Sequence, residues 1–192
     1  MASIKGYALK DLKTMKGKEG DIIRCTITKN GKNVAEFFDD GWGGEPEVTM
    51  VGTMKYDEFI KDLKSLTPFY RKRSDAVGID YGFSIEYGVG LLVDDLRNLL
   101  IVENQYKKNL RNYAKKYPFG NFRLGCVVLW SDTQIGFKWV PFITRTKTTE
   151  QQMEKIGKEM QDAYVKQNGT GRRSIIEYYY SLDDFQLLKE SA

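Results

Sequence analysis

The sequence predicts an α+β protein, in which an N-terminal antiparallel β-meander with one covering helix precedes a helix-rich α+β part that contains a β-hairpin. Three observations lead to this class. Apolar and polar residues alternate over much of residues 7–51, as in half-buried strands. A helical period of apolar residues follows over 54–66 and again over 91–116. Two alternating segments, 122–130 and 135–143, then flank a short polar turn at 131–134.

The first domain, residues 1–66, is expected to hold four strands and a helix. Strands are predicted over 7–12, 21–29, 32–38 and 48–51, and Asn30-Gly31 has the residue types of a type I′ hairpin turn. In the second strand the alternation places one set of residues inward, namely Ile23, Cys25 and Ile27, and another outward, namely Arg24, Thr26 and Thr28. The helix over 54–66 carries an apolar stripe of Tyr56, Phe59, Ile60 and Leu63.

The second domain, residues 67–192, begins with a connector over 67–78 that holds a proline and three consecutive basic residues. Its long helix over 91–116 is either continuous or broken near Val102. After the hairpin, Thr148 or Thr149 is expected to cap a second helix that ends in the segment Gly169–Gly171. A strand over 174–180 and a short helix over 181–188 complete the predicted elements.

The composition excludes several kinds of catalytic site, because the chain contains no histidine. Histidine-based triads, HExxH zinc sites and histidine general bases are therefore ruled out. Carboxylates could still bind Mg²⁺, Mn²⁺ or Ca²⁺. Cys25 and Cys126 lie in apolar segments and are interpreted as buried, reduced core residues. We therefore expect no enzyme activity, no catalytic residue, no resident metal and no cofactor.

Neither a membrane span nor a secretory signal is visible in the sequence, so a cytoplasmic location and no membrane partner are expected. The net charge is only +4, but it is unevenly distributed. Residues 1–66 balance 11 basic against 11 acidic side chains, whereas residues 67–192 carry 19 basic and 15 acidic ones. The excess of basic residues therefore lies in the second domain, and any charged binding surface must be sought in local clusters of charge.

The first candidate surface is the segment EFFDDGWGGEPE, in which a tryptophan stands among three glycines and five carboxylates. The glycines are typical of a tight connection between strands, and the carboxylate spacing does not match an EF-hand. Two interpretations of the indole remain: it folds back onto the sheet, or it anchors a basic partner. The candidate partner-binding residues are Asp39, Asp40, Trp42, Glu45 and Glu47.

The second candidate surface is a basic run without acidic residues between Lys107 and Arg123. On a helix, Lys107, Arg111 and Lys115 share one face, where like charges repel each other. The run is either a solvated helix face or a binding site for DNA or RNA. Its residues are Lys107, Lys108, Arg111, Lys115, Lys116 and Arg123.

A third pattern is the aromatic series Trp130, Phe137, Trp139 and Phe142, followed by three tyrosines at 178–180. Exposed aromatic side chains beside basic ones can stack on single-stranded nucleic acid. Alternation along a strand would instead place about half of them in a core, and core packing is the favoured interpretation.

Residues 12–45 resemble the opening domain of small uncharacterised proteins from phages and mobile elements of gut Firmicutes. The shared pattern consists of a KGxxG turn at Lys16–Gly20, NGKxVA at Asn30–Ala35 and DDxxGGE at Asp39–Glu45. Small proteins of this gene pool often inhibit host defence systems, including CRISPR nucleases. The resemblance thus implies a non-catalytic, anti-CRISPR-like inhibitor that binds a host defence protein or ribonucleoprotein complex in the host cytoplasm. Direct nucleic-acid binding and a carboxylate-metal nuclease are the alternatives, and the oligomeric state is not predicted.

Overall fold

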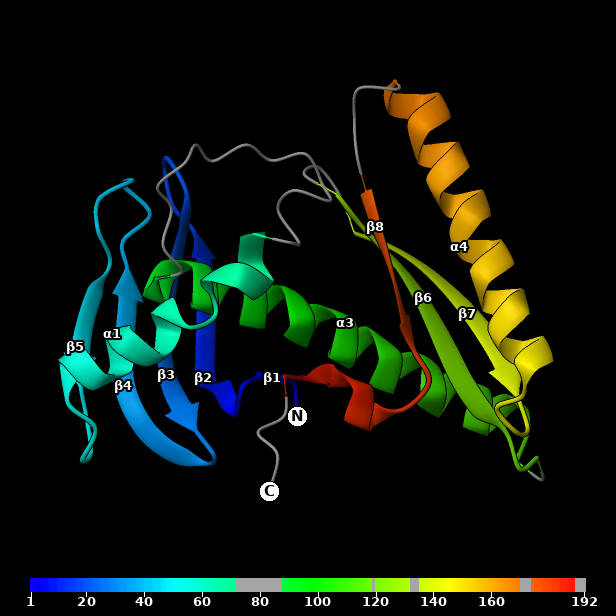
Figure 1. The fold of residues 1–192 in the computed structure, drawn as a ribbon, viewed down its shortest axis with the longest axis horizontal. Helices are drawn as coiled ribbons and strands as arrows, with labels where there is room; N and C mark the ends of the chain where they lie inside the picture. The colour runs from blue at the N-terminus through cyan, green and yellow to red at the C-terminus, as the bar shows by residue number, and fades with distance from the viewer. Residues whose placement is uncertain (72–87, 119, 132–134, 170–173, 189–192) are drawn as a thin grey trace. The chain divides into compact units, whose positions relative to one another are not determined.

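The computed structural model of the chain describes residues 1–71, 88–118, 120–131, 135–169 and 174–188 (Figure 1). The protein is α+β, as predicted, with a six-stranded sheet and a three-stranded sheet. It divides into two compact units. The first unit consists of Met1–Leu66, Glu86–Ile101 and Gln186–Ala192, and the second of Thr67–Ile85 and Val102–Phe185. Most of the predicted connector over 67–78 and of the turn over 131–134 lies outside the described residues.

The first unit is built on the predicted meander. Its sheet has the strand order β5-β4-β3-β2-β1-β9, and all pairs are antiparallel except β1 with β9. In chain order the strands are β1 (Ser3–Ile4), β2 (Tyr7–Lys16), β3 (Asp21–Lys29), β4 (Lys32–Asp39), β5 (Glu47–Met50) and β9 (Gln186–Leu187). The strands β2 to β5 lie side by side in Figure 1.

The hairpin between β3 and β4 has the predicted turn. Asn30 and Gly31 have φ angles of 49° and 80°, which a type I′ turn requires of both central residues. The alternation in β3 is also confirmed, except at Thr28, which is buried. The register shifts between Ile27 and Thr28, and the Thr28 hydroxyl donates a hydrogen bond to the Ala8 carbonyl at 3.2 Å. This bond satisfies the hydroxyl and allows its burial.

Helix α1 (Tyr56–Lys64) buries Phe59 and Leu63, and the Phe59 ring lies 5.7 Å from that of Tyr7 in the sheet. Tyr56 was expected in the buried stripe, but this prediction is wrong. It is the first residue of the helix and its side chain is 50% exposed, so the buried stripe begins at Phe59.

A charge cluster also links α1 to the sheet. The Asp62 carboxylate accepts hydrogen bonds from Lys5 and Lys29, each at 2.5 Å, and from the Tyr7 hydroxyl at 2.7 Å. Burial by itself would raise the pKa of Asp62. The hydrogen bonds from Lys29, Lys5 and Tyr7, together with the Lys29 charge, outweigh burial and lower this pKa from 3.8 to about 2.

Asp62→Asn is expected to lower the free energy of unfolding by about 1–2 kcal/mol at pH 7, a range discounted for the solvent that reaches this pair. Because the folded-state pKa is depressed, the stabilisation is fully present above the unfolded-state pKa of 3.8 and is lost as the pH falls through about 2. Urea denaturation at several pH values checks both statements. The exposed Asp57→Asn is the control, and an Asp62→Asn deficit that does not shrink at low pH would contradict the assignment.

Helix α3 (Val89–Lys116) is continuous, so the alternative with a break near Val102 is wrong. Val102 is fully buried within a helical stripe that also contains Leu92, Leu96 and Leu99. The apolar period therefore continues through this position, and no helix-breaking residue interrupts it.

The second unit has an antiparallel sheet with the order β7-β6-β8. Its strands are β6 (Arg123–Ser131), β7 (Ile135–Phe142) and β8 (Ser174–Tyr179), and helix α4 (Lys147–Asn168) packs on the sheet. Val127, Val140 and Met153 form a buried cluster between the helix and the sheet.

Two local predictions in this unit are wrong. The cap of α4 is Thr146, whose Oγ1 accepts the Thr149 N–H at 3.2 Å, because Thr149 already lies in the first helical turn. The predicted helix over 181–188 is a 3₁₀ turn at Leu182–Phe185 followed by β9. Phe185 is fully buried and stacks on Tyr179 with ring centroids 4.4 Å apart, which holds the turn against the core.

Candidate partner-binding surface

Trp42 lies in the connection between β4 and β5, and its side chain is 57% exposed. Of the two interpretations of this indole, folding back onto the sheet is therefore wrong. The Lys18 Nζ lies 5.7 Å from the ring centroid and forms a cation–π contact with it. An exposed tryptophan is an unusual surface residue, since it leaves a large apolar area in contact with water.

The backbone around Trp42 is held by local hydrogen bonds. The Gly41 N–H donates to the Asp39 carboxylate at 2.8 Å, and the Trp42 N–H donates to the Asp40 carboxylate at 2.9 Å. Both are the Asx type of contact that shapes tight turns. Asp39 and Asp40, which were predicted to bind a partner, therefore also order the loop that carries the indole.

Gly41 packs this loop against the turn between β2 and β3. Its φ angle is 71°, and a Cβ atom built on it would lie 2.9 Å from the Gly20 carbonyl oxygen. Only glycine combines this left-handed conformation with so close an approach. The indole is thus presented from a backbone that rests on a neighbouring turn.

The carboxylates predicted for this surface differ in their environments. Asp40, Glu45 and Glu47 are exposed, whereas Asp39 is half-buried at the end of β4. Glu45 and Glu47 form no ion pair with any other residue that the structure describes. Their negative charges remain available to a cationic partner.

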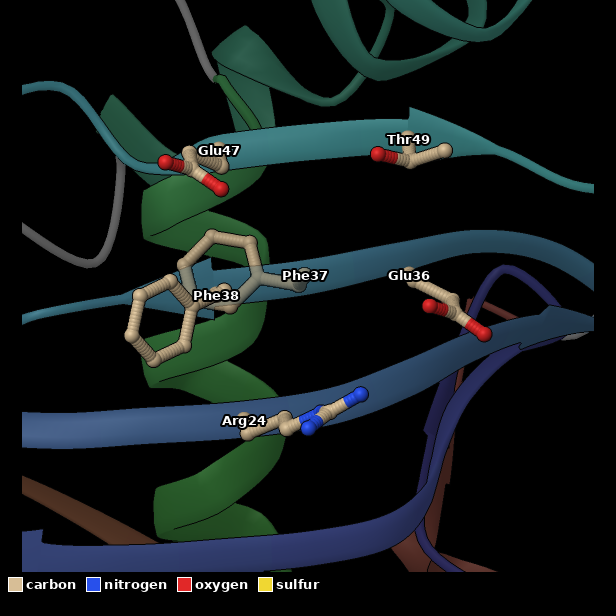
Figure 2. A pocket seen from close by; sticks show the side chains of 6 residues that line it. All are labelled: Arg24, Glu36, Phe37, Phe38, Glu47 and Thr49. Carbon is tan, nitrogen blue, oxygen red and sulfur yellow. The ribbon is translucent and has the colours of Figure 1, made fainter.

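A groove on the outer face of the same sheet was not predicted. It has a volume of about 280 Å³, and Figure 2 shows its side chains on β3, β4 and β5 with α3 passing behind the strands. Phe38 is 39% exposed there, whereas its neighbour Phe37, which also contributes to the lining, is buried. The lining consists of Arg24, Glu36, Phe37, Phe38, Glu47 and Thr49.

The sequence did contain one signal for this groove. Two adjacent phenylalanines in one strand must face opposite sides of the sheet, so one ring had to face outward. Which residues stand beside that ring depends on strand register. Phe38 pairs with Arg24 on one side and Glu47 on the other, and Glu36 pairs with Thr49.

The basic run of the second unit is largely exposed. Lys108, Arg111, Lys115, Lys116 and Arg123 are exposed, and Lys107 is partly so. Lys107 pairs with the buried Glu103 one turn earlier at 3.0 Å, so its charge is already balanced. The Lys116 Nζ lies 5.3 Å from the Tyr117 ring centroid. Five of the six predicted basic residues therefore remain as candidates for contact with an anion.

The aromatic series divides as alternation requires. Trp130, Phe142 and Tyr179 are buried, and the Trp130 Nε1 donates to Glu177 at 2.6 Å. Phe137 and Trp139 are half-buried, with nearly parallel rings whose centroids lie 6.1 Å apart. The series thus belongs largely to the core of the second unit.

Both cysteines are buried, as predicted. Burial raises the pKa of the Cys25 thiol to about 11 and the pKa of Cys126 further still, so both stay protonated at neutral pH. Among the described residues, no three His, Cys, Asp or Glu side chains gather as a metal site would require. No helix within the described ranges has the length and apolar character needed to cross a bilayer.

Comparison with protein-family models, with curated proteins and with solved structures found no match to this chain.

Proposed function

We propose that this chain is a non-catalytic binding protein of a phage or mobile element that inhibits a host nucleic-acid-directed defence complex. The observation that carries the proposal is the exposed Trp42 on a hydrogen-bonded loop with exposed carboxylates on either side of it in the sequence. Tryptophan is among the residues that contribute most binding energy at protein interfaces when a partner buries it. The defence target is inferred from the resemblance of residues 12–45 to proteins of phages and mobile elements.

The charge of the loop supports a basic partner. Asp40, Glu45 and Glu47 flank Trp42 in the sequence and are exposed. A protein that binds nucleic acid has a positive groove for phosphates, and an acidic surface would be attracted to that groove. Binding is therefore expected to become slower and weaker as salt concentration rises.

Affinity purification from a lysate of a gut Firmicute with active defence systems, combined with a phage plaque assay, tests the proposal. The expected result is recovery of a nuclease or another defence protein by the tagged chain, together with protection of the phage when the chain is expressed. Recovery of no such protein and no change in plaque number would contradict it.

Direct nucleic-acid binding is a second candidate, favoured by the exposed basic side chains on α3. If it operates, Arg111→Glu with Lys115→Glu should abolish a gel shift that weakens steeply as salt rises. Lys107 is left in place because it pairs with the buried Glu103. Under the inhibitor proposal, the double variant should capture the protein partner as well as the wild type does. No gel shift by the wild type at low salt would exclude this candidate.

A further inference from the structure

The groove beside Phe38 has a chemistry distinct from that of the Trp42 loop. Strand register places Arg24, Phe38 and Glu47 in one row across β3, β4 and β5. Glu36 lies two residues before Phe38 and therefore on the same outer face. The exposed Phe38 ring thus has one carboxylate opposite it on the neighbouring strand, from Glu47, and one farther along its own strand, from Glu36 (Figure 2).

The charged side chains of the groove form no ion pairs within the described part of the chain. Glu36 and Glu47 form no ion pair with another described residue, and neither does Arg24. With two carboxylates and one guanidinium, the lining carries a formal charge of −1 and favours a cation. Arg24 stands on the β3 side of Phe38, and its guanidinium points toward the Glu36 end of the groove (Figure 2). The side of the groove farthest from this positive charge is therefore at Glu47, on β5.

The exposed ring determines which cation fits best. A guanidinium is planar and weakly hydrated, so it can stack on an aromatic face while its N–H groups donate to carboxylates. An ammonium is compact and strongly hydrated, and a phosphate would be repelled by Glu36 and Glu47. The Thr49 hydroxyl beside Glu36 offers one further acceptor.

We propose that this groove is a subsite for one arginine side chain of the basic partner, with the guanidinium over Phe38 and between Glu36 and Glu47. The inference rests on the proposed function and specifies the partner chemistry. The loop that carries Trp42 joins the strand of Phe38 to the strand of Glu47. The indole and the arginine subsite are therefore carried by one stretch of chain, from β4 through the loop to β5.

An NMR titration of the ¹⁵N-labelled chain tests the subsite with N-acetyl-arginine amide as the probe. The lysine analogue and the neutral, nearly isosteric citrulline analogue are the comparison probes. Arginine is expected to shift the amides of residues 36–38 and 47–49 saturably, the lysine analogue to bind about fivefold more weakly, and citrulline to leave them unchanged. Equal binding of arginine and lysine, or shifts spread evenly over all acidic residues, would overturn the proposal.

Variants locate the probe. Glu36→Gln with Glu47→Gln should abolish the saturable shifts, and Phe38→Leu should weaken binding while keeping an apolar side chain. Glu58→Gln is the matched control, since Glu58 is an exposed carboxylate of the same unit that does not line the groove. Arginine shifts that survive the double substitution, in variants whose spectra remain folded, would refute the site.

The titration needs no partner protein, so its outcome is separable from that of the proposed function. A negative titration, with a defence protein still captured through Trp42, would remove the arginine subsite alone. A positive titration with no captured defence protein would contradict the proposed target but would still support a groove that binds a guanidinium group.

Discussion

Trp42→Ala is expected to weaken binding to the captured partner by between about 30-fold and 1000-fold, the range for loss of an interface hot spot worth about 2–4 kcal/mol. The indole is 57% exposed in the free chain, so a partner could remove most of its apolar area from water. Calorimetry or surface plasmon resonance with the purified partner measures the change.

The same substitution should leave the melting temperature nearly unchanged, because the ring is more than half exposed and its cation–π contact is with the exposed Lys18. Tyr56→Ala is the matched control, since Tyr56 is a comparably exposed aromatic residue of the same unit. A marked fall in melting temperature on Trp42→Ala would place the indole in the core. An equal loss of affinity on Tyr56→Ala would show that the effect is not specific to the acidic loop.

Gly41→Ala is expected to lower the free energy of unfolding by about 2–4 kcal/mol, more than most surface substitutions do. The φ angle of 71° is unfavourable for alanine, and the new methyl group would meet the Gly20 carbonyl oxygen at 2.9 Å. The atoms nearest to the new methyl group belong to the backbone of Gly20 and Asp21, so relief requires the loop to move away from the turn. Partner binding should fall as well, since Trp42 is the next residue.

Gly43→Ala is the control for this prediction. Gly43 has a φ angle of 76°, but nothing lies within 4 Å of a Cβ at this position. Its substitution should therefore show only the left-handed strain, about 1–2 kcal/mol. Chemical denaturation measures the free energy of unfolding of both variants. The loss in Gly43→Ala gives the cost of the backbone strain, and the additional loss in Gly41→Ala gives the cost of the close approach. Equal losses of stability would contradict the packing of the loop against the β2–β3 turn.

Local sequence signals predicted much of the first unit. Alternation in β3 and the Asn30-Gly31 pair required only neighbouring residues, and both were confirmed apart from Thr28. Strand β9 could not be predicted in this way. Its residues pair with β1 through Ser3 and Gln186, which lie at opposite ends of the sequence, and this long-range pairing determines their conformation.

The candidate surface was predictable only in part. The composition of the loop identified Trp42 and its carboxylates, but alternation ends with β4 at Asp39 and could not decide whether the ring faces water. The Phe38 groove depends on which residues of β3 and β5 stand beside β4, and register is a tertiary property. The ion pair between Lys107 and Glu103 does not follow from the composition of the basic run, because Glu103 lies one helical turn before the run begins.

Fluorine NMR of the chain labelled with 5-fluorotryptophan tests most directly whether a partner binds Trp42. The three tryptophans give three resonances, and a Trp42→Phe variant assigns the one from the loop. When the purified partner is added, the Trp42 resonance is predicted to shift and to lose its solvent isotope effect, while those of Trp130 and Trp139 stay in place. An unchanged Trp42 resonance in the saturated complex would contradict the account.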